Sequence, residues 1–234
     1  MQMADWLSSG IQPPTGEVLE YLEYRGLTPE LHSRVNVGMW ATPNIPAPDP
    51  GFRGRCGPVG EKILGRVVLP SLTPRGEIIG IEARSLDKTL TGYRVPGAKW
   101  APYWVTTSNA MEALWSRSRV WIVEGFFDLV ALVRVVPSQD VVISTLRAGI
   151  NQVQVEHLRR FCKGGVIIAY DNDETGRKAA IGYQEDNGRR RFGAIDHMER
   201  AGLHVTRCRY IGKDPGEVWL SKGDQGLMRA FGAY

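Results

Sequence analysis

The sequence predicts an α/β chain whose C-terminal part is a mostly parallel sheet flanked by helices, preceded by an N-terminal α+β part. The main observation is a repeated pattern: a short apolar run ends in an acidic residue and is followed by a helical pattern. It occurs at residues 120–132 and again at residues 165–180. Short apolar runs rich in β-branched residues indicate strands that are buried on both faces, as in parallel sheets.

The later repeat places two acids directly after its strand. Residues 166–170 form the apolar run, Asp171 and Asp173 follow, and residues 175–180 have the pattern of a helix start. Ligands of open α/β sheets bind beyond the carboxyl ends of the strands, and two carboxylates with oxygen-only surroundings suit Mg²⁺ or Mn²⁺. Taken alone, the pattern fits equally well a helix capped by Asp173 and a solvated Asp171.

The earlier repeat has the same design. Its apolar run ends at Glu124, Gly125 allows a turn, and a helix that begins near Phe126 places both Glu124 and Asp128 near its first turn. The positive end of the helix dipole tolerates negative charge, but several carboxylates together repel one another unless a cation is present. The two repeats together therefore favour a metal site over a simple helix cap.

Glu124-Gly125 with Asp128, followed by Asp171-Asn172-Asp173, resembles the Toprim domain of topoisomerases and primases, and most closely that of the bacterial replicative primases. Residues 144–149, with a helical pattern at 152–161, resemble the strand-turn-helix link of that family. Residues 212–217 resemble its late acidic element. The four elements occur in the family's order over residues 120–219, which makes the resemblance specific.

The resemblance implies a set of functional residues in this domain. Glu124 would be the general acid or base and Asp171 and Asp173 the central metal ligands, so these three are the candidate catalytic residues. The implied ligands of Mg²⁺ or Mn²⁺ are Glu124, Asp128, Asp171, Asp173 and Asp214. Such ions stabilise charge on the attacking and leaving oxygens in phosphoryl transfer.

The chain departs from the family at three positions. Asn172 replaces the glycine between the two aspartates, which is tolerable because asparagine accepts unusual turn dihedrals. Gly216 replaces an outer acidic ligand, whose role falls to Glu217 or is lost. Arg147 stands where a glycine is common.

The candidate nucleotide- and DNA-binding residues are basic. Lys213, Arg177 and Lys178 are candidate phosphate contacts, although Arg177 and Lys178 are equally well explained as surface residues of a helix. Three consecutive arginines at 189–191, in a stretch that interrupts the expected helix, indicate either a phosphate-binding loop or a solubilising excursion.

The N-terminal part predicts a flexible lead at 1–15, a helix at 16–27 and a hairpin of strands 63–71 and 77–85. This hairpin resembles an element of the primases in which Arg66 and Arg84 would face the template or the triphosphate; the alternative is that both are solvated strand residues. Gly92 stands where that family has a lysine, so its basic role passes to Arg94 or Lys99, or is absent.

Composition sets broader limits. A chain of 234 residues with 43% hydrophobic and 23% charged residues is ordinary for a globular protein, and its formal net charge of +4 permits nucleic-acid binding. Three scattered cysteines predict neither a disulfide framework nor a zinc ribbon, and a P-loop motif is absent. Without a membrane-length apolar run or a signal pattern, we expect no membrane association and a location in the cytoplasm of a bacterial or phage-infected cell.

The sequence thus predicts a stand-alone, primase-like nucleotidyltransferase, a DNA-directed RNA polymerase, with a flexible lead (1–15), a basic α+β subdomain (16–117) and a Toprim domain (118–234). It would make short RNA primers from nucleoside triphosphates on single-stranded DNA, with a replicative helicase as candidate partner. One alternative is a Toprim metal-dependent nuclease, in which the same acids hydrolyse phosphodiesters. The other is a non-catalytic module that binds single strands or a helicase.

Overall fold

The computed structural model describes residues 11–28, 31, 35, 37–40, 64–72, 78–87, 93–95, 105–106 and 118–232. The chain divides into two compact units, Met1–Tyr103 and Trp104–Tyr234. Among the described residues, no helix has the length and apolar character that a membrane span requires.

The N-terminal unit contains an antiparallel sheet and the helix α2 (Gly16–Tyr24). The neighbouring strands β3 (Val67–Leu72) and β4 (Ile78–Arg84) are paired along their lengths, which confirms the predicted hairpin. The strands lie in the order β1 (Ile11–Gln12), β2 (Gly38–Trp40), β3, β4 and β5 (Tyr93–Val95). Val18 and Leu22 form the buried face of α2, because they lie one helical turn apart.

The C-terminal unit is built on a second five-stranded sheet. Its strand order is β12 (Val205–Arg207), β9 (Val166–Ile168), β7 (Val120–Val123), β8 (Val141–Ser144) and β6 (Val105–Thr106). The first four strands are parallel to their neighbours and β6 is antiparallel to β8. The strand β6 pairs with β8 and so belongs to this sheet, although it precedes residue 118, where the sequence analysis places the start of the Toprim domain.

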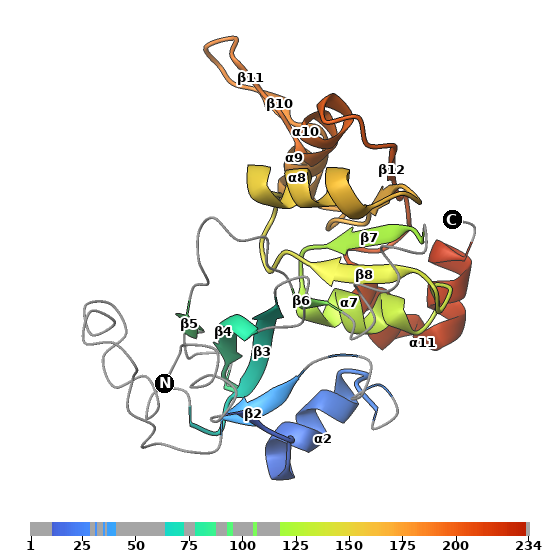
Figure 1. Ribbon diagram of the computed structural model, residues 1–234. Helices are drawn as coiled ribbons and strands as arrows, with labels where there is room; N and C mark the ends of the chain where they lie inside the picture. Colours follow the sequence, from blue (N-terminus) through green and yellow to red (C-terminus); the bar gives the residue numbers. More distant parts are fainter. Residues whose placement is uncertain are drawn as a thin grey trace, which may run out of the picture. The chain divides into compact units, whose positions relative to one another are not determined.

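Helices cover both faces of this sheet (Figure 1). One face carries α8 (Gln152–Phe161), α9 (Glu174–Ile181) and α10 (Ala194–Arg200), and the other carries α7 (Phe126–Val133) and α11 (Pro215–Phe231). All residues of α7 are buried, because the helix lies between the sheet and α11. The sequence therefore predicted the α/β class correctly.

Alternate strand residues build the core beneath α8, α9 and α10. Val120 and Ile122 of β7 and Ile168 of β9 are fully buried there, packed with Leu158 of α8 and Met198 of α10. Burial of each such side chain stabilises the fold by roughly 1.5–3 kcal/mol. This core fixes the strands whose ends carry the acidic residues.

A two-stranded hairpin interrupts the path from α9 to α10. Its strands are β10 (Tyr183–Gln184) and β11 (Arg190–Arg191), paired antiparallel. In Figure 1 the hairpin extends away from the helices of its unit. The expected interruption of the helix is therefore present, and its conformation is a hairpin.

Candidate metal and catalytic centre

Acidic residues follow three neighbouring parallel strands of the C-terminal sheet. Glu124 comes directly after β7, Asp171 comes after β9, and Asp214 lies between β12 and α11. Because β12, β9 and β7 run in the same direction, their carboxyl ends lie at one edge of the sheet. The edge therefore receives carboxylates from segments far apart in the sequence.

Glu124 and Asp171 are linked directly. The backbone N–H of Asp171 donates a hydrogen bond to Oε1 of Glu124 at 3.2 Å. Gly176 in the first turn of α9 packs against both: a Cβ at this position would lie 2.7 Å from Oε1 of Glu124 and in collision with the carbonyl oxygen of Asp171. A glycine at this position lets α9 begin in contact with the acids.

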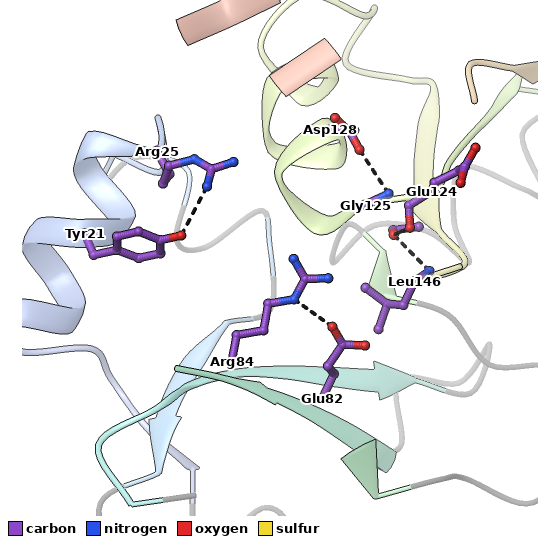
Figure 2. Close-up of polar contacts among 9 residues, drawn as sticks. Tyr21, Arg25, Glu82, Arg84, Glu124, Gly125, Asp128 and Leu146 are labelled. Carbon is purple, nitrogen blue, oxygen red and sulfur yellow. Dashed lines mark hydrogen bonds and ion pairs between the residues drawn. The ribbon is translucent and has the colours of Figure 1, made fainter. Parts of the chain in front are cut away.

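Asp128 and Asp214 are held by backbone groups at helix starts. The oxygens of Asp128 accept hydrogen bonds from Gly125 N–H (Figure 2) and Gly216 N–H, each at 3.0 Å. Oδ1 of Asp214 accepts one from Glu217 N–H at 2.7 Å, as the N-cap of α11. Asp128 thus has both oxygens engaged by backbone groups, and its carboxyl group also interacts with the neighbouring carboxyl group of Asp214.

Asp173 caps α9, because its Oδ1 accepts a hydrogen bond from Gly176 N–H at 2.9 Å. The cap that the sequence offered as an alternative is therefore present. It does not exclude metal binding, since the second oxygen of Asp173 is not used by the cap. Oδ1 of Asp171 is buried and has no hydrogen-bond partner.

Burial and mutual repulsion act on these carboxyl groups. Burial, followed by the charges of Asp173 and Asp128, raises the pKa of Glu124 to about 7, against an opposing hydrogen bond from Asp171 N–H. Burial and the charges of Glu124, Asp214 and Asp173 raise the pKa of Asp171 to about 7, and Lys213 opposes this shift. Burial and the charge of Asp214 raise the pKa of Asp128 to about 7. The carboxyl groups of this site therefore repel one another when they are ionised, and the nearby charge of Lys213 offsets part of that repulsion at Asp171.

This chemistry fits a hard divalent cation, which prefers carboxylate oxygens and would relieve the repulsion. The buried Oδ1 of Asp171 has no hydrogen-bond partner, so it is the oxygen most readily available as a ligand for a cation. As the side chains stand, however, no three acidic, histidine or cysteine side chains within the described ranges are close enough together to hold an ion. Binding of one ion by the five predicted ligands is therefore a proposal, and it requires the side chains to move. Asp128 is the least free to move, because both of its oxygens accept hydrogen bonds from the backbone.

The region that holds these acids is similar to a known family of domains. Residues 121–215 match the family model described as Toprim-like. Because of this similarity, we refer to residues 121–215 as the Toprim-like domain. It contains Glu124, Asp128, Asp171, Asp173 and Asp214.

The chain as a whole resembles the catalytic core of bacterial primases. It is 27% identical to a DNA primase of Aquifex aeolicus (strain VF5) over 242 residues, covering 91% of this chain and 44% of that protein. The RNA polymerase domain of Mycobacterium tuberculosis primase DnaG, in complex with a double-stranded DNA oligomer with a 6-nucleotide overhang, matches with a TM-score of 0.63, 21% identity and coverage of 98% and 77%. A DnaG primase catalytic domain bound to ssDNA matches with a TM-score of 0.61, 20% identity and the same coverage. The chain spans less than half the length of the Aquifex aeolicus DNA primase.

The predicted basic residues have different surroundings. Within the Toprim-like domain, Arg177 and Lys178 form ion pairs with Glu174 at 2.8 Å and 3.3 Å on the surface of α9. Lys213 acts electrostatically on Asp171, which places its charge near the acids. The structure thus relates Lys213 to the acidic site more directly than it relates Arg177 and Lys178.

In the N-terminal unit, Arg66 precedes β3 and is half-buried. Arg84 forms an ion pair with Glu82 at 2.6 Å on β4 (Figure 2). Two basic residues were expected to replace the missing lysine. The backbone of Arg94 lies in β5, and Lys99 lies outside the described residues.

Sequence reasoning missed one structural role of Asn172. Its backbone N–H donates to the carbonyl oxygen of Lys213 at 2.6 Å, and its Nδ2 donates to the carbonyl oxygens of Tyr210 and Gly212 at 3.2 Å and 3.3 Å. Asn172 thereby joins the turn that carries Asp171 and Asp173 to the loop before α11. The departure from glycine was visible in the sequence, but its partners lie some forty residues away and carried no local signal.

Proposed function

We propose that this chain is the catalytic part of a DNA primase, which joins nucleoside triphosphates into short RNA on a single-stranded DNA template. The observation that carries the proposal is the cluster of acids at the ends of three parallel strands in a Toprim-like domain. The proposal is supported by a curated relative that is a DNA primase and by a fold neighbour bound to ssDNA. A replicative helicase is a candidate partner.

The residues of the site take distinct parts in this proposal. Asp171 and Asp173, with Glu124 and Asp214, would hold Mg²⁺ or Mn²⁺, which supplies charge stabilisation at the attacking and leaving oxygens. Glu124 would accept the proton of the attacking hydroxyl or donate to the leaving group. Lys213 would contact phosphate, while Asp128 holds the turn after β7 in place.

The test is RNA synthesis by the purified chain on circular single-stranded DNA, with labelled ribonucleotides and Mg²⁺ or Mn²⁺. A circle has no 3′ end, so label in short chains reports new initiation rather than extension. Asp171→Asn and Asp173→Asn should abolish synthesis. Glu156→Gln, which removes an exposed carboxylate from α8, is the matched control and should be active.

Other results would overturn the proposal in definite ways. A circle that is cut without synthesis, in an Asp171-dependent manner, would make the chain a Toprim nuclease. Strand binding with neither synthesis nor cleavage, also after addition of a replicative helicase, would make it a binding module.

A further inference from the structure

The hairpin between α9 and α10 leaves and rejoins the Toprim-like domain at one point. Gly182 precedes β10, and a Cβ added to it would lie 2.8 Å from the backbone nitrogen of Gly193, which follows the hairpin. A Cβ on Gly193 would likewise collide with the backbone of Ala180 and Gly182. The hairpin is therefore a module inserted between two adjacent backbone positions.

A hollow of about 470 Å³ lies at the base of this hairpin. Its volume is within the range of small-ligand sites, roughly 300–1,000 Å³. We call it the α9 hollow; its walls include Gly149, Thr175, Lys178, Tyr183, Phe192 and His197. Thr175 and Lys178 lie on the helix whose N-cap is Asp173, so the hollow extends along α9 from a position close to the acids.

Two aromatic side chains at the hollow remain accessible. Tyr183 and Phe192 are each 40% exposed, although large aromatic side chains gain most by burial. Cations accompany both rings: Nζ of Lys178 lies 5.3 Å from the centre of the Tyr183 ring, and the guanidinium groups of Arg200 and Arg190 lie 3.6 Å and 5.7 Å from that of Phe192. Arg200 stacks on one face of Phe192, which leaves Tyr183 as the more open ring. Exposed rings beside cations are the elements with which proteins stack unpaired bases and hold their phosphates.

The hairpin itself carries three consecutive arginines. Arg190 and Arg191 form ion pairs with Asp196 and Glu185, and their side chains are 61% and 51% exposed. The partner carboxylates are only 22% and 23% exposed, but each guanidinium is more than half exposed and has several N–H donors, so it can contact a phosphate as well. Arg189 makes no ion pair with any residue that the structure describes. Glu185, Asp186 and Asp196 balance the charge of the three arginines. A nucleic-acid strand bound at this surface would therefore depend on stacking more than on net charge.

We infer that the hairpin and the α9 hollow form a binding site for single-stranded nucleic acid. An unpaired base stacks on Tyr183 or on the face of Phe192 that Arg200 does not cover, and the adjoining phosphates contact the arginines of 189–191. The path along α9 holds the strand close to the catalytic acids. The site adds a strand-holding role to the proposed function, but strand binding here does not require synthesis.

The test is binding of a fluorescent oligothymidylate of about 12 nucleotides to the full chain at several salt concentrations. Tyr183→Ala and Phe192→Ala should each weaken binding about tenfold at every salt concentration, because stacking is not ionic. Arg189→Ala should reduce the salt dependence by about 0.7 in log–log slope, as expected for one lost phosphate contact. Tyr24→Ala, which removes an exposed tyrosine of the N-terminal unit, and Arg159→Ala on α8 are matched controls and should bind as wild type.

A chain with residues 183–192 deleted, so that Gly182 is joined to Gly193, should show both the weaker binding and the reduced salt dependence. Its circular dichroism spectrum should remain that of a folded α/β protein. If the deletion variant does not fold, the point variants decide. The inference is overturned if the hairpin variants bind the oligothymidylate as tightly as wild type does. The inference is also overturned if the hairpin variants weaken binding of duplex DNA as much as binding of the single strand. Competition by dTTP with an affinity equal to that of the oligothymidylate would overturn it as well. Hairpin-dependent binding by a chain that makes no RNA would refute the proposed function and leave this inference standing.

Discussion

The backbone N–H of Gly216 donates a hydrogen bond to Oδ1 of Asp128 across 88 residues of sequence. The other carboxylate oxygen accepts from Gly125 N–H. Asp128 therefore connects the turn after β7 to the first turn of α11, beside the N-cap Asp214. This geometry makes Asp128 a residue that positions the site, and less suited to binding a metal than the other four acids.

Replacing Asp128 by alanine should destabilise the fold. Two backbone N–H groups would lose their acceptor, and each unsatisfied buried donor costs about 1–3 kcal/mol. Asp128→Asn keeps one acceptor oxygen and should lose less. Urea unfolding measures both variants, and a midpoint for Asp128→Ala equal to that of wild type would contradict the assigned role.

The metal-free protein should lose stability as the pH rises from about 4 to about 7. The pKa values of Glu124, Asp128 and Asp171 are raised to about 7 in the folded state. Unfolding returns them to their ordinary values near 4, so in this window the folded state binds more protons than the unfolded state. The melting temperature in EDTA should therefore be lower at pH 8 than at pH 5, and Mn²⁺ should raise it at pH 8.

Asp171→Asn is the control for this titration. It removes one repelling charge, and its Oδ1 has no hydrogen bond to lose. At pH 8 in EDTA the variant should melt about 2–4 °C above wild type, which corresponds to about 1 kcal/mol after allowance for the partial exposure of the group. It should also gain less than wild type from Mn²⁺; an equal gain would place the ion elsewhere.

Gly176→Ala should impair the site without removing any acid. The added Cβ would collide with the Asp171 carbonyl and press on Glu124, so both carboxylates must shift. We expect synthesis to fall about tenfold or more, since misplacement by about 1 Å can cost two orders of magnitude. Glu174→Ala, at an exposed position of the same helix, should be far less affected when the two are assayed together.

Asn172→Ala should loosen the connection between the Asp171–Asp173 turn and the loop before α11. The variant loses the two hydrogen bonds of Nδ2 but keeps the backbone bond to Lys213. Calorimetric titration with Mn²⁺ should show several-fold weaker binding, with a loss of stability of about 1 kcal/mol. Unchanged Mn²⁺ affinity would show that Asn172 does not position the site.

The sequence determined the features that local patterns encode. Apolar runs ending at Glu124 and before Asp171 specified buried parallel strands, and the acids after them specified at which edge of the sheet carboxylates gather. The hairpin of β3 and β4 and the interruption after α9 were also readable, because turn residues and breaks in periodicity are local signals.

The tertiary structure decided which groups these residues meet. Asp128 was expected among the metal ligands, yet the N–H of Gly216 occupies one of its oxygens, and Arg177 and Lys178 pair with Glu174. The place of β6 in the second sheet and the hollow at the base of the hairpin likewise depend on contacts between distant segments. A pattern of residue types fixes periodicity and turn positions, but hydrogen-bond partners and packing across the sheet are chosen only when the chain has folded.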